Sequence, residues 1–220
     1  MDAYRFGQLW MRNLNPDQES DGEAVFDRLK ANYSEPCRRY HDGSHIEQCL
    51  LWLDRYRQTI EDPDAVELAI WFHDACYGPD PKGHEERGAA LLRELAQDRM
   101  APQRLDKICT MIALTTHQTP VDDPEQALML DIDLASFARP WAEYLRDTVR
   151  CQEERQLVNP ACDYRGQLEF LRELIRRPQL YHHAQFRADH EPAARQNIIQ
   201  LIELLEARPE CQDAPESLAG

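Results

Sequence analysis

Glycine is scarce in this chain, with 8 residues among 220, and the alternation of apolar and polar residues that marks strands is nearly absent. Apolar residues recur instead at spacings of three and four, which is the periodicity of helices. No apolar run approaches the roughly 20 residues that a helix needs to cross a bilayer. These shortages predict an all-α fold without a membrane-spanning segment.

Paired cysteines and a leader segment are missing as well. The chain has 7 cysteines, an odd number, and no two of them form a Cys-x-x-Cys pair. This argues against a disulfide scaffold and against a thiolate zinc site. The first residues, Met1 to Phe6, lack the basic and apolar regions of a signal peptide. We therefore expect a cytoplasmic protein.

Basic residues are the third shortage. The chain has 25 Lys and Arg residues against 40 Asp and Glu residues, and its formal net charge is −15. Such a surface repels nucleic-acid backbones and anionic lipids at long range, so neither nucleic acid nor membrane is an expected partner. A small anionic substrate stays compatible, because a metal ion and a few arginines can reverse the potential locally.

The length of the chain suits one large domain with a substantial core, and neither an internal repeat nor a linker is visible. We predict one multi-helix domain over residues 1–207, with core motifs in 33–138, C-terminal helices in 140–207 and a flexible tail in 208–220. Helices are expected at 4–14, from about 22, from 44, from 63, and at 85–96, 102–117, 124–138, 141–156, 164–177 and 192–207.

The sharpest feature of the sequence is Trp71-Phe72-His73-Asp74, at the end of a strongly apolar helical segment. A buried imidazole and a buried carboxylate are costly unless both have polar partners. A divalent cation is one such partner, although a His-Asp dipeptide alone is also common as a surface pair or a helix-end charge.

Two further segments can complete a metal site. Ser44 and Glu47 fit a capping box, which would place His45 in the first turn of a helix. The segment Asp131-Ile132-Asp133 offers a carboxylate from the middle of a later helix. Two imidazoles and two carboxylates suit one divalent ion, namely Mn²⁺, Fe²⁺, Co²⁺, Ni²⁺, Mg²⁺ or Zn²⁺.

Spacing does not decide which aspartate of that segment binds. Residues two apart on a helix point about 200° from one another, so Asp131 and Asp133 cannot share a face. Asp133 shares a stripe with Leu130 and Phe137, whereas Asp131 shares one with Ala127 and Leu134. Both stripes are apolar, so either aspartate is compatible with a buried site.

The order His45, His73-Asp74, Asp133 resembles the HD superfamily of metal-dependent phosphohydrolases. More narrowly, residues 33–205 resemble a bacterial family of predicted HD-superfamily phosphohydrolases, through the segments 39–46, 69–77, 130–134, 164–165 and 191–197. The resemblance implies an HD-type helical bundle and hydrolysis of a small phosphorylated substrate such as a nucleotide. It also implies His45, His73, Asp74 and Asp133 as metal ligands, with Asp131 in reserve.

Three residues near these motifs are candidates for catalytic roles. Glu85 would be a general acid or base, or else an exposed carboxylate in the first turn of a helix. His41 would orient a ligand or hold the substrate, or else belong to a loop. His117 would face the pocket or cap a helix. The chain departs from the family at His84 and Gly88, where the family tends to have Asn and Ser.

Phosphate recognition would fall to arginine, because a guanidinium binds phosphate through two hydrogen bonds. Arg39 and Arg150 are the candidates, with Arg38 and Lys82 as weaker ones, although each arginine taken singly is better explained as a surface residue of an acidic protein.

Two other functions fit the same residues. One is a di-iron HD-type oxygenase, for which His84 and His117 would supply further ligands. The other is a non-catalytic HD module that senses a nucleotide. The sequence leaves open the substrate, the native metal and the oligomeric state, and it contains no Gly-rich phosphate loop.

Overall fold

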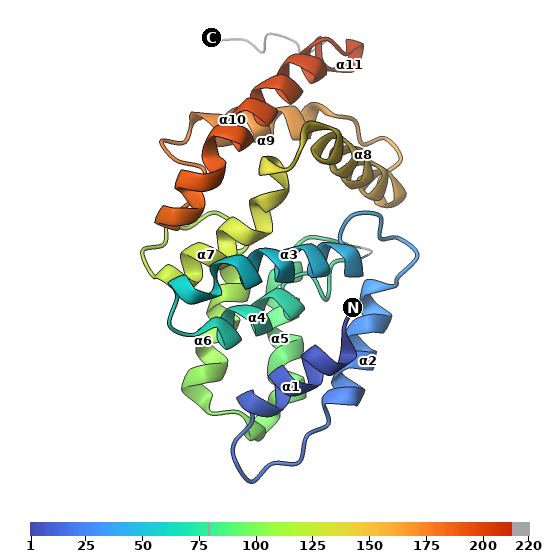
Figure 1. Ribbon diagram of the computed structural model, residues 1–220. Helices are drawn as coiled ribbons and strands as arrows, with labels where there is room; N and C mark the ends of the chain where they lie inside the picture. Colours follow the sequence, from blue (N-terminus) through green and yellow to red (C-terminus); the bar gives the residue numbers. More distant parts are fainter. Residues whose placement is uncertain (79, 213–220) are drawn as a thin grey trace, which may run out of the picture. The chain divides into compact units, whose positions relative to one another are not determined.

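The computed structural model describes residues 1–78 and 80–212, and these residues form helices, turns and loops with no strand. The all-α prediction is confirmed. The chain divides into two compact units, Met1–Ala135 and Ser136–Gly220, which are coloured from blue to yellow-green and from yellow to red in Figure 1. The expectation of one domain over residues 1–207 stays a prediction.

The first unit is built around α4. Its elements are α1 (Ala3–Asn13), α2 (Gly22–Tyr33), α3 (Gly43–Tyr56), η1 (Arg57–Thr59), α4 (Pro63–Phe72), α5 (His84–Ala96), η2 (Gln97–Arg99), α6 (Pro102–Leu114) and α7 (Pro124–Asp133). Helix α4 packs against α1, α3, α5, α6 and α7. Every residue from Ala65 to Phe72 is buried, so α4 is the core helix on which the others are arranged.

The start of α4 follows from local chemistry. Asp62 is the N-cap, and its side chain accepts a hydrogen bond from the Ala65 amide at 3.1 Å, with proline in the first turn. Glu125 of α7 accepts two more hydrogen bonds, from the amides of Glu61 and Asp62 at 3.1 Å each. The Ala65 amide, which has no partner within the helix, is thus satisfied by the cap, and the predicted helix start at residue 63 is confirmed.

Aromatic side chains hold α1 and α2 against α4. The rings of Phe6 and Trp71 meet edge to face, with centroids 5.1 Å apart, and those of Trp10 and Phe72 stack at 6.3 Å. Phe26 of α2 lies edge to face against Trp71 as well. Such pairs add to the burial of large apolar surfaces, which dominates core stability.

The second unit contains α8 (Trp141–Val158), α9 (Arg165–Arg176), α10 (Ala184–Glu206) and α11 (Pro209–Gln212). Helix α10 packs against α8, α9 and α11. The side chain of Asn197 donates hydrogen bonds to the carbonyls of Phe137 and Arg139, at 2.7 and 2.8 Å. These bonds fasten α10 to the segment that precedes α8.

Two predictions about helix starts are wrong. The cap of α3 is Asp42, which accepts a hydrogen bond from the Ser44 amide at 2.8 Å, whereas Glu47 pairs with the N-terminal ammonium group. Helix α10 begins at Ala184, and Pro192 lies inside it. An interior proline removes one backbone donor and crowds the carbonyl four residues before it, yet the helix extends back to Ala184, and Phe186 in its first turn is fully buried.

Two helix ends also differ from the prediction. Helix α6 ends at Leu114, three residues before His117. Helix α7 ends at Asp133 and is followed by the short η3 (Leu134–Ala138), so the aspartate segment lies at the end of a helix and not in its middle. Both differences change the direction in which a candidate site residue can point.

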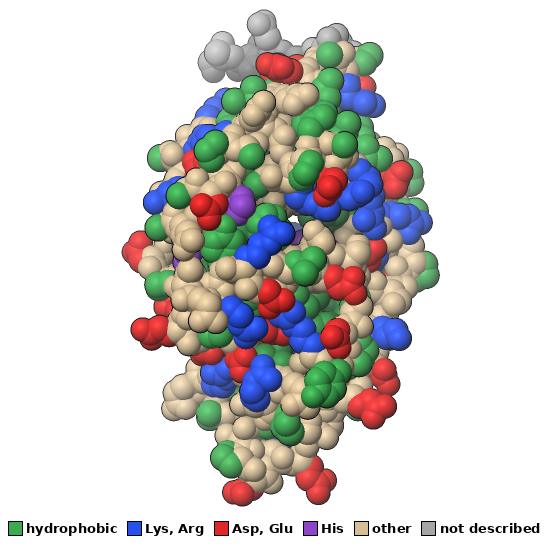
Figure 2. Space-filling model, viewed as in Figure 1, with side chains coloured by type: hydrophobic (Ala, Val, Ile, Leu, Met, Phe, Trp, Pro, Cys, Tyr) green, Lys and Arg blue, Asp and Glu red, His purple; other side chains and the backbone are tan. Residues whose placement is uncertain are grey.

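Regular structure continues beyond residue 208, where we expected a flexible tail, because Pro209–Gln212 form α11. The rest of that expected tail, 213–220, lies outside the described residues. None of the helices in 1–78 and 80–212 combines the length and the apolar character that a bilayer crossing requires. On the face drawn in Figure 2, acidic and basic side chains are interspersed, although the net charge is strongly negative.

Candidate metal centre

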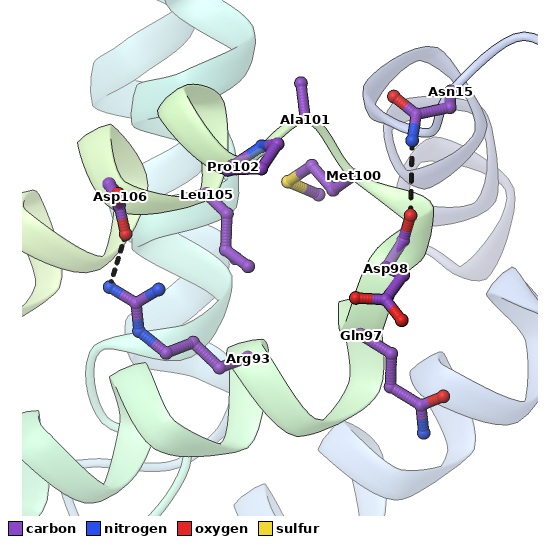
Figure 3. A pocket seen from close by; sticks show the side chains of 9 residues that line it. All are labelled: Asn15, Arg93, Gln97, Asp98, Met100, Ala101, Pro102, Leu105 and Asp106. Carbon is purple, nitrogen blue, oxygen red and sulfur yellow. Dashed lines mark hydrogen bonds and ion pairs between the residues drawn. The ribbon is translucent and has the colours of Figure 1, made fainter.

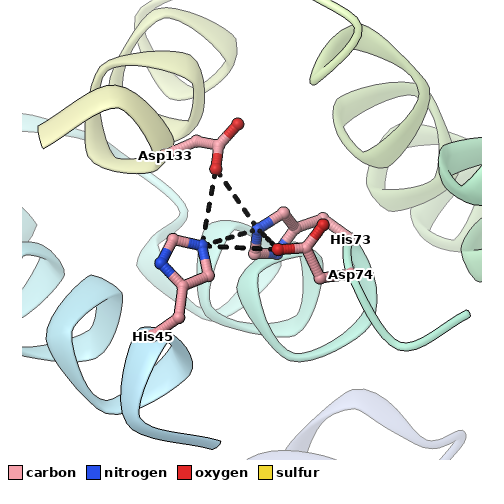
Figure 4. A group of neighbouring side chains, drawn as sticks. All are labelled: His45, His73, Asp74 and Asp133. Carbon is pink, nitrogen blue, oxygen red and sulfur yellow. Dashed lines mark hydrogen bonds and ion pairs between the residues drawn. The ribbon is translucent and has the colours of Figure 1, made fainter. Parts of the chain in front are cut away.

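Three helices bring the predicted metal ligands together at the C-terminal end of α4. His45 lies in the first turn of α3, His73 caps the end of α4, Asp74 follows directly, and Asp133 is the last residue of α7. Because α3 and α7 both pack on α4, the four side chains converge on one point (Figure 4).

The four ligand atoms are close enough to share one ion. His73 Nε2 lies 3.1 Å from Asp74 Oδ2, 3.3 Å from His45 Nε2 and 3.4 Å from Asp133 Oδ1. His45 Nε2 lies 3.4 Å from Asp74 Oδ2 and 3.5 Å from Asp133 Oδ1. All four atoms lie within 4.8 Å of one another. Ligands at about 2.1 Å from a divalent ion are separated from their neighbours by about 3.0–3.4 Å, so the cluster has the right size.

The hydrogen bonding of the cluster is compatible with a cation between the four side chains. His73 Nδ1 donates to the carbonyl of Ile70 at 2.9 Å, which leaves Nε2 of a neutral ring with a lone pair directed at the carboxylates. Within the described residues, Asp74 Oδ2 is buried and has no hydrogen-bond partner. Acceptor atoms that face one another in a buried site fit a cation between them. The side chains therefore fit a divalent ion.

The pKa values of the cluster are shifted by the same contacts. Burial lowers the pKa of His73, but Asp74 and Asp133 outweigh it and raise this pKa well above its ordinary value. Burial raises the pKa of Asp74, but His73 and His41 outweigh it, so this pKa lies well below its ordinary value. Burial also raises the pKa of Asp133, but hydrogen bonds from the neighbouring imidazoles, first of all His117, outweigh burial, so this pKa lies well below its ordinary value. Both carboxylates stay ionised.

A second pair of histidines holds the outer oxygens of the two carboxylates. His84 Nε2 lies 3.0 Å from Asp74 Oδ1, and His117 Nε2 lies 2.8 Å from Asp133 Oδ2. His117 has a left-handed backbone, with φ at 55°, a conformation that is uncommon for residues other than glycine and that occurs preferentially at functional sites. Partners of this kind fix the orientation of ligating carboxylates.

The sequence suggested His84 as a possible ligand of a second ion, and in the structure it contacts Asp74. Its Nδ1 donates to the carbonyl of Pro81 at 2.7 Å, so the ring needs a proton on both nitrogens to donate also to Asp74. Burial lowers the pKa of His84, but the bond to Asp74 outweighs it and the pKa is raised. The close approach of α5 to the end of α4 depends on Gly88, because a Cβ there would lie 2.4 Å from the carbonyl oxygen of Phe72. A residue with a Cβ does not fit here unless the backbone shifts.

Cys49 is a further neighbour that the sequence did not single out. Its Sγ lies 3.7 Å from His45 Nε2, one helical turn along α3. Burial raises the pKa of this thiol strongly, so the sulfur stays protonated and outside the ligand set. Asp131 is also buried but does not belong to the group of four ligands.

The remaining candidates surround the cluster at different distances. The side chain of Glu85 is 12% exposed, and its Oε2 lies 3.4 Å from His84 Nδ1. The ring of His41 stacks on that of Tyr77, with centroids 3.9 Å apart, and lies 5.9 Å from the ring of His45. Both residues lie beside the cluster.

The candidate phosphate-binding residues differ more. Arg39 is half-buried, and its Nη1 donates to the carbonyls of Pro36 and Arg38 at 2.7 and 2.9 Å. Arg38 is not a phosphate clamp, because its side chain is 1% exposed and its nitrogens bind backbone carbonyls. Lys82 is exposed in the loop before α5. Arg150 lies on α8 of the second unit, and its role stays a prediction.

A pocket of about 520 Å³ lies between the end of α5 and the start of α6. Figure 3 shows polar contacts between lining residues: Arg93 binds Asp106 at 2.8 Å, and the Asn15 side chain donates to the Asp98 carbonyl at 3.3 Å. The lining contains none of the predicted site residues.

Comparison with known proteins adds no relative. No family model, no curated protein and no solved structure matches this chain. The functional argument therefore depends on the cluster and its surroundings.

Proposed function

We propose that the protein is a metal-dependent phosphohydrolase of the HD type, which holds one divalent cation between His45, His73, Asp74 and Asp133. The observation that carries this proposal is the buried Asp74 Oδ2 without a hydrogen-bond partner, 3.1 Å from the ring nitrogen of His73. The order of the four ligands along the chain, which resembles that of the HD superfamily, supports the same assignment.

A divalent ion in such a site lowers the pKa of a bound water and polarises a phosphoryl oxygen. The chain's own residues would do the remaining work. His84 and His117 hold the outer carboxylate oxygens, so the ligands need little rearrangement when substrate binds. Glu85, partly exposed beside His84, is placed to exchange a proton with water or with the leaving group.

The charge pattern is compatible with a small phosphate ester. The formal charges of two carboxylates and one divalent ion cancel, and the raised pKa of His84 favours a positive charge beside them. His41 and Tyr77 offer flat surfaces on the same side as His84, since Tyr77 also lies edge to face against the His84 ring at 4.9 Å. A phosphate with an attached planar group, such as a nucleotide, fits this combination.

The test is hydrolysis by the purified protein of p-nitrophenyl phosphate and of nucleoside mono- and triphosphates, with Mn²⁺, Co²⁺, Ni²⁺ or Mg²⁺ added. We expect phosphate or pyrophosphate release with at least one metal, and its loss in Asp74→Asn and Asp133→Asn. Asp131→Asn is the matched control and should keep activity. Failure of every substrate and metal while the ion binds would favour the nucleotide-sensing role, and equal activity of Asp74→Asn would place the site elsewhere.

One observation favours a second candidate, the di-iron oxygenase. His84 Nε2 lies beside Asp74 Oδ1, so a third imidazole stands where a second ion would need one. The described residues nevertheless contain one group of ligands close enough to share an ion. Elemental analysis discriminates: two irons per chain would favour the oxygenase, and one exchangeable ion the hydrolase.

A further inference from the structure

The guanidinium of Arg38 is buried beneath the metal cluster. Its side chain is 1% exposed, and the loop that carries it, between α2 and α3, lies directly before the helix of His45. A buried guanidinium is costly unless its five N–H donors find acceptors. The partners of this side chain therefore indicate why it is there.

Most of those partners are backbone carbonyls on two sides of the cluster. Nη1 donates to the carbonyls of His41 and Asp74 at 2.6 and 2.9 Å, and Nη2 donates to the carbonyl of Ala75 at 3.1 Å. Nε donates to the Glu35 carboxylate at 3.0 Å. The planar guanidinium of Arg38 thus joins His41, two residues before α3, to Asp74 and Ala75, which follow α4.

The carbonyls at the end of a helix have no partner within the helix, and a cation near them is favourable. Two side chains at the end of α2 donate hydrogen bonds to such carbonyls at the end of α4. Tyr33 Oη donates to the Trp71 carbonyl at 3.0 Å, and the Asn32 side chain donates to the Ala75 carbonyl at 3.0 Å. Of these three side chains, Arg38 is the one that also donates to the carbonyl of His41, near the start of α3.

We infer that Arg38 is a positioning residue, which fixes the separation between His45 and the His73-Asp74 pair and thereby sets the affinity of the cation site. This role requires the several N–H donors of a planar guanidinium, because a lysine ammonium cannot bind the carbonyls of His41, Asp74 and Ala75 in one plane. The inference rests on the proposed cation site and is independent of the reaction catalysed there.

The test compares Arg38→Met and Arg38→Lys with a matched control, Arg5→Met. Arg5 is also part-buried and binds carboxylates, Glu67 at 2.6 Å and Asp54 at 2.7 Å, but it contacts α4 in its first half. Co²⁺ is titrated into each full-length, metal-free protein, with calorimetry for affinity and visible absorption for coordination geometry. Unfolding of the metal-free proteins is measured in parallel.

We expect Co²⁺ affinity to fall about 10–100-fold in both Arg38 variants, the range for residues that orient ligands, with an altered Co²⁺ spectrum. Arg5→Met should bind Co²⁺ within twofold of the wild type. Arg38 variants that bind within twofold, or an equal loss in Arg5→Met, would overturn the inference. If Arg38→Met does not fold, Arg38→Lys decides by the same thresholds. Absence of Co²⁺ binding by the wild type would instead remove the cation site itself, and both proposals with it.

Discussion

Each end of α4 has a buried and a half-buried carboxylate beside it, but the partners that balance these acids differ. At the first end, Asp62 binds Arg104 at 3.0 Å and Lys107 at 3.2 Å, and Glu125 accepts two backbone amides. At the second end, Asp74 and Asp133 contact imidazoles, and Asp74 Oδ2 has no hydrogen-bond partner within the described residues.

The difference separates a structural network from a binding site on one helix. Permanent cations and backbone donors complete the first end, so its acids serve stability. The second end lacks a permanent cation on its carboxylates, because the guanidinium of Arg38 is bonded to the Asp74 backbone and not to its side chain. Substitutions at the second end should therefore change metal affinity, and substitutions at the first end should change stability alone.

The largest effect is expected from Asp74→Ala. The variant removes one ligand and should lower Co²⁺ affinity by more than about 100-fold, since changes even in residues that orient ligands cost about 10–100-fold. Calorimetric titration of the metal-free protein measures this loss. Glu125→Gln, at the other end of α4, should bind Co²⁺ as the wild type does, and a comparable loss there would erase the contrast between the ends.

A somewhat smaller loss is expected from His117→Asn. Asparagine tolerates the left-handed backbone of this position, so the change removes the imidazole bonded to Asp133 Oδ2 without new strain. Co²⁺ affinity should fall about 10–100-fold. His190→Asn, on α10 in the second unit, is the control, and unchanged affinity in His117→Asn would mean that Asp133 needs no orienting partner.

Next in size is Gly88→Ala. Its Cβ would lie 2.4 Å from the Phe72 carbonyl oxygen, so α5 must shift away from the end of α4, at a cost of about 1–3 kcal/mol. At Gly7, in α1, a Cβ would meet no atom within 4 Å, and Gly7→Ala should stabilise the protein by about 0.5–1 kcal/mol. Denaturant unfolding measures both, and stabilisation in Gly88→Ala would contradict the close packing of α5.

The smallest expected effect is the pH dependence of the stabilisation by Asp62, at the first end of α4. Burial raises the pKa of Asp62, but Arg104, the Ala65 amide and Lys107 outweigh it and lower this pKa. A carboxyl whose pKa is lowered in the folded state stabilises it above the unfolded pKa of about 3.9, and this stabilisation is lost as the pH falls through the folded pKa.

Asp62→Asn should accordingly lower the free energy of unfolding by about 1 kcal/mol at pH 7, and the difference from the wild type should shrink below about pH 4. Urea unfolding across this pH range measures it. Asp64→Asn, which removes a more exposed pair with Arg12, should cost about 0.5 kcal/mol or less. A constant difference for Asp62→Asn at all pH values would show that its charge plays no part.

Local patterns predicted most of the fold. Asp62-Pro63 marks the start of α4, and the apolar run before His73 indicates a buried helix, so both were predictable from neighbours in sequence. The cap of α3 was missed because Asp42 and Ser44 are both good cap residues, and sequence alone does not show at which of them the helix starts. The start of α10 was missed because tertiary packing keeps Pro192 inside a helix.

The cluster was predictable in its composition but not in its surroundings. The choice of Asp133 over Asp131 depends on where α7 ends, and periodicity left that open. The contact of His84 with Asp74 depends on how closely α5 approaches α4, which Gly88 permits. The carbonyl contacts of Arg38 join segments about 36 residues apart, and no local pattern encodes them.

The most direct test of a cation site at the second end of α4 is the stoichiometry of Co²⁺ binding to the metal-free wild-type protein, measured by calorimetry together with unfolding. The account predicts one ion per chain and, at a free Co²⁺ concentration of about 100 times the dissociation constant, a rise of about 2.7 kcal/mol in the free energy of unfolding. No binding at millimolar Co²⁺, or binding that survives unchanged in Asp74→Ala, would contradict it.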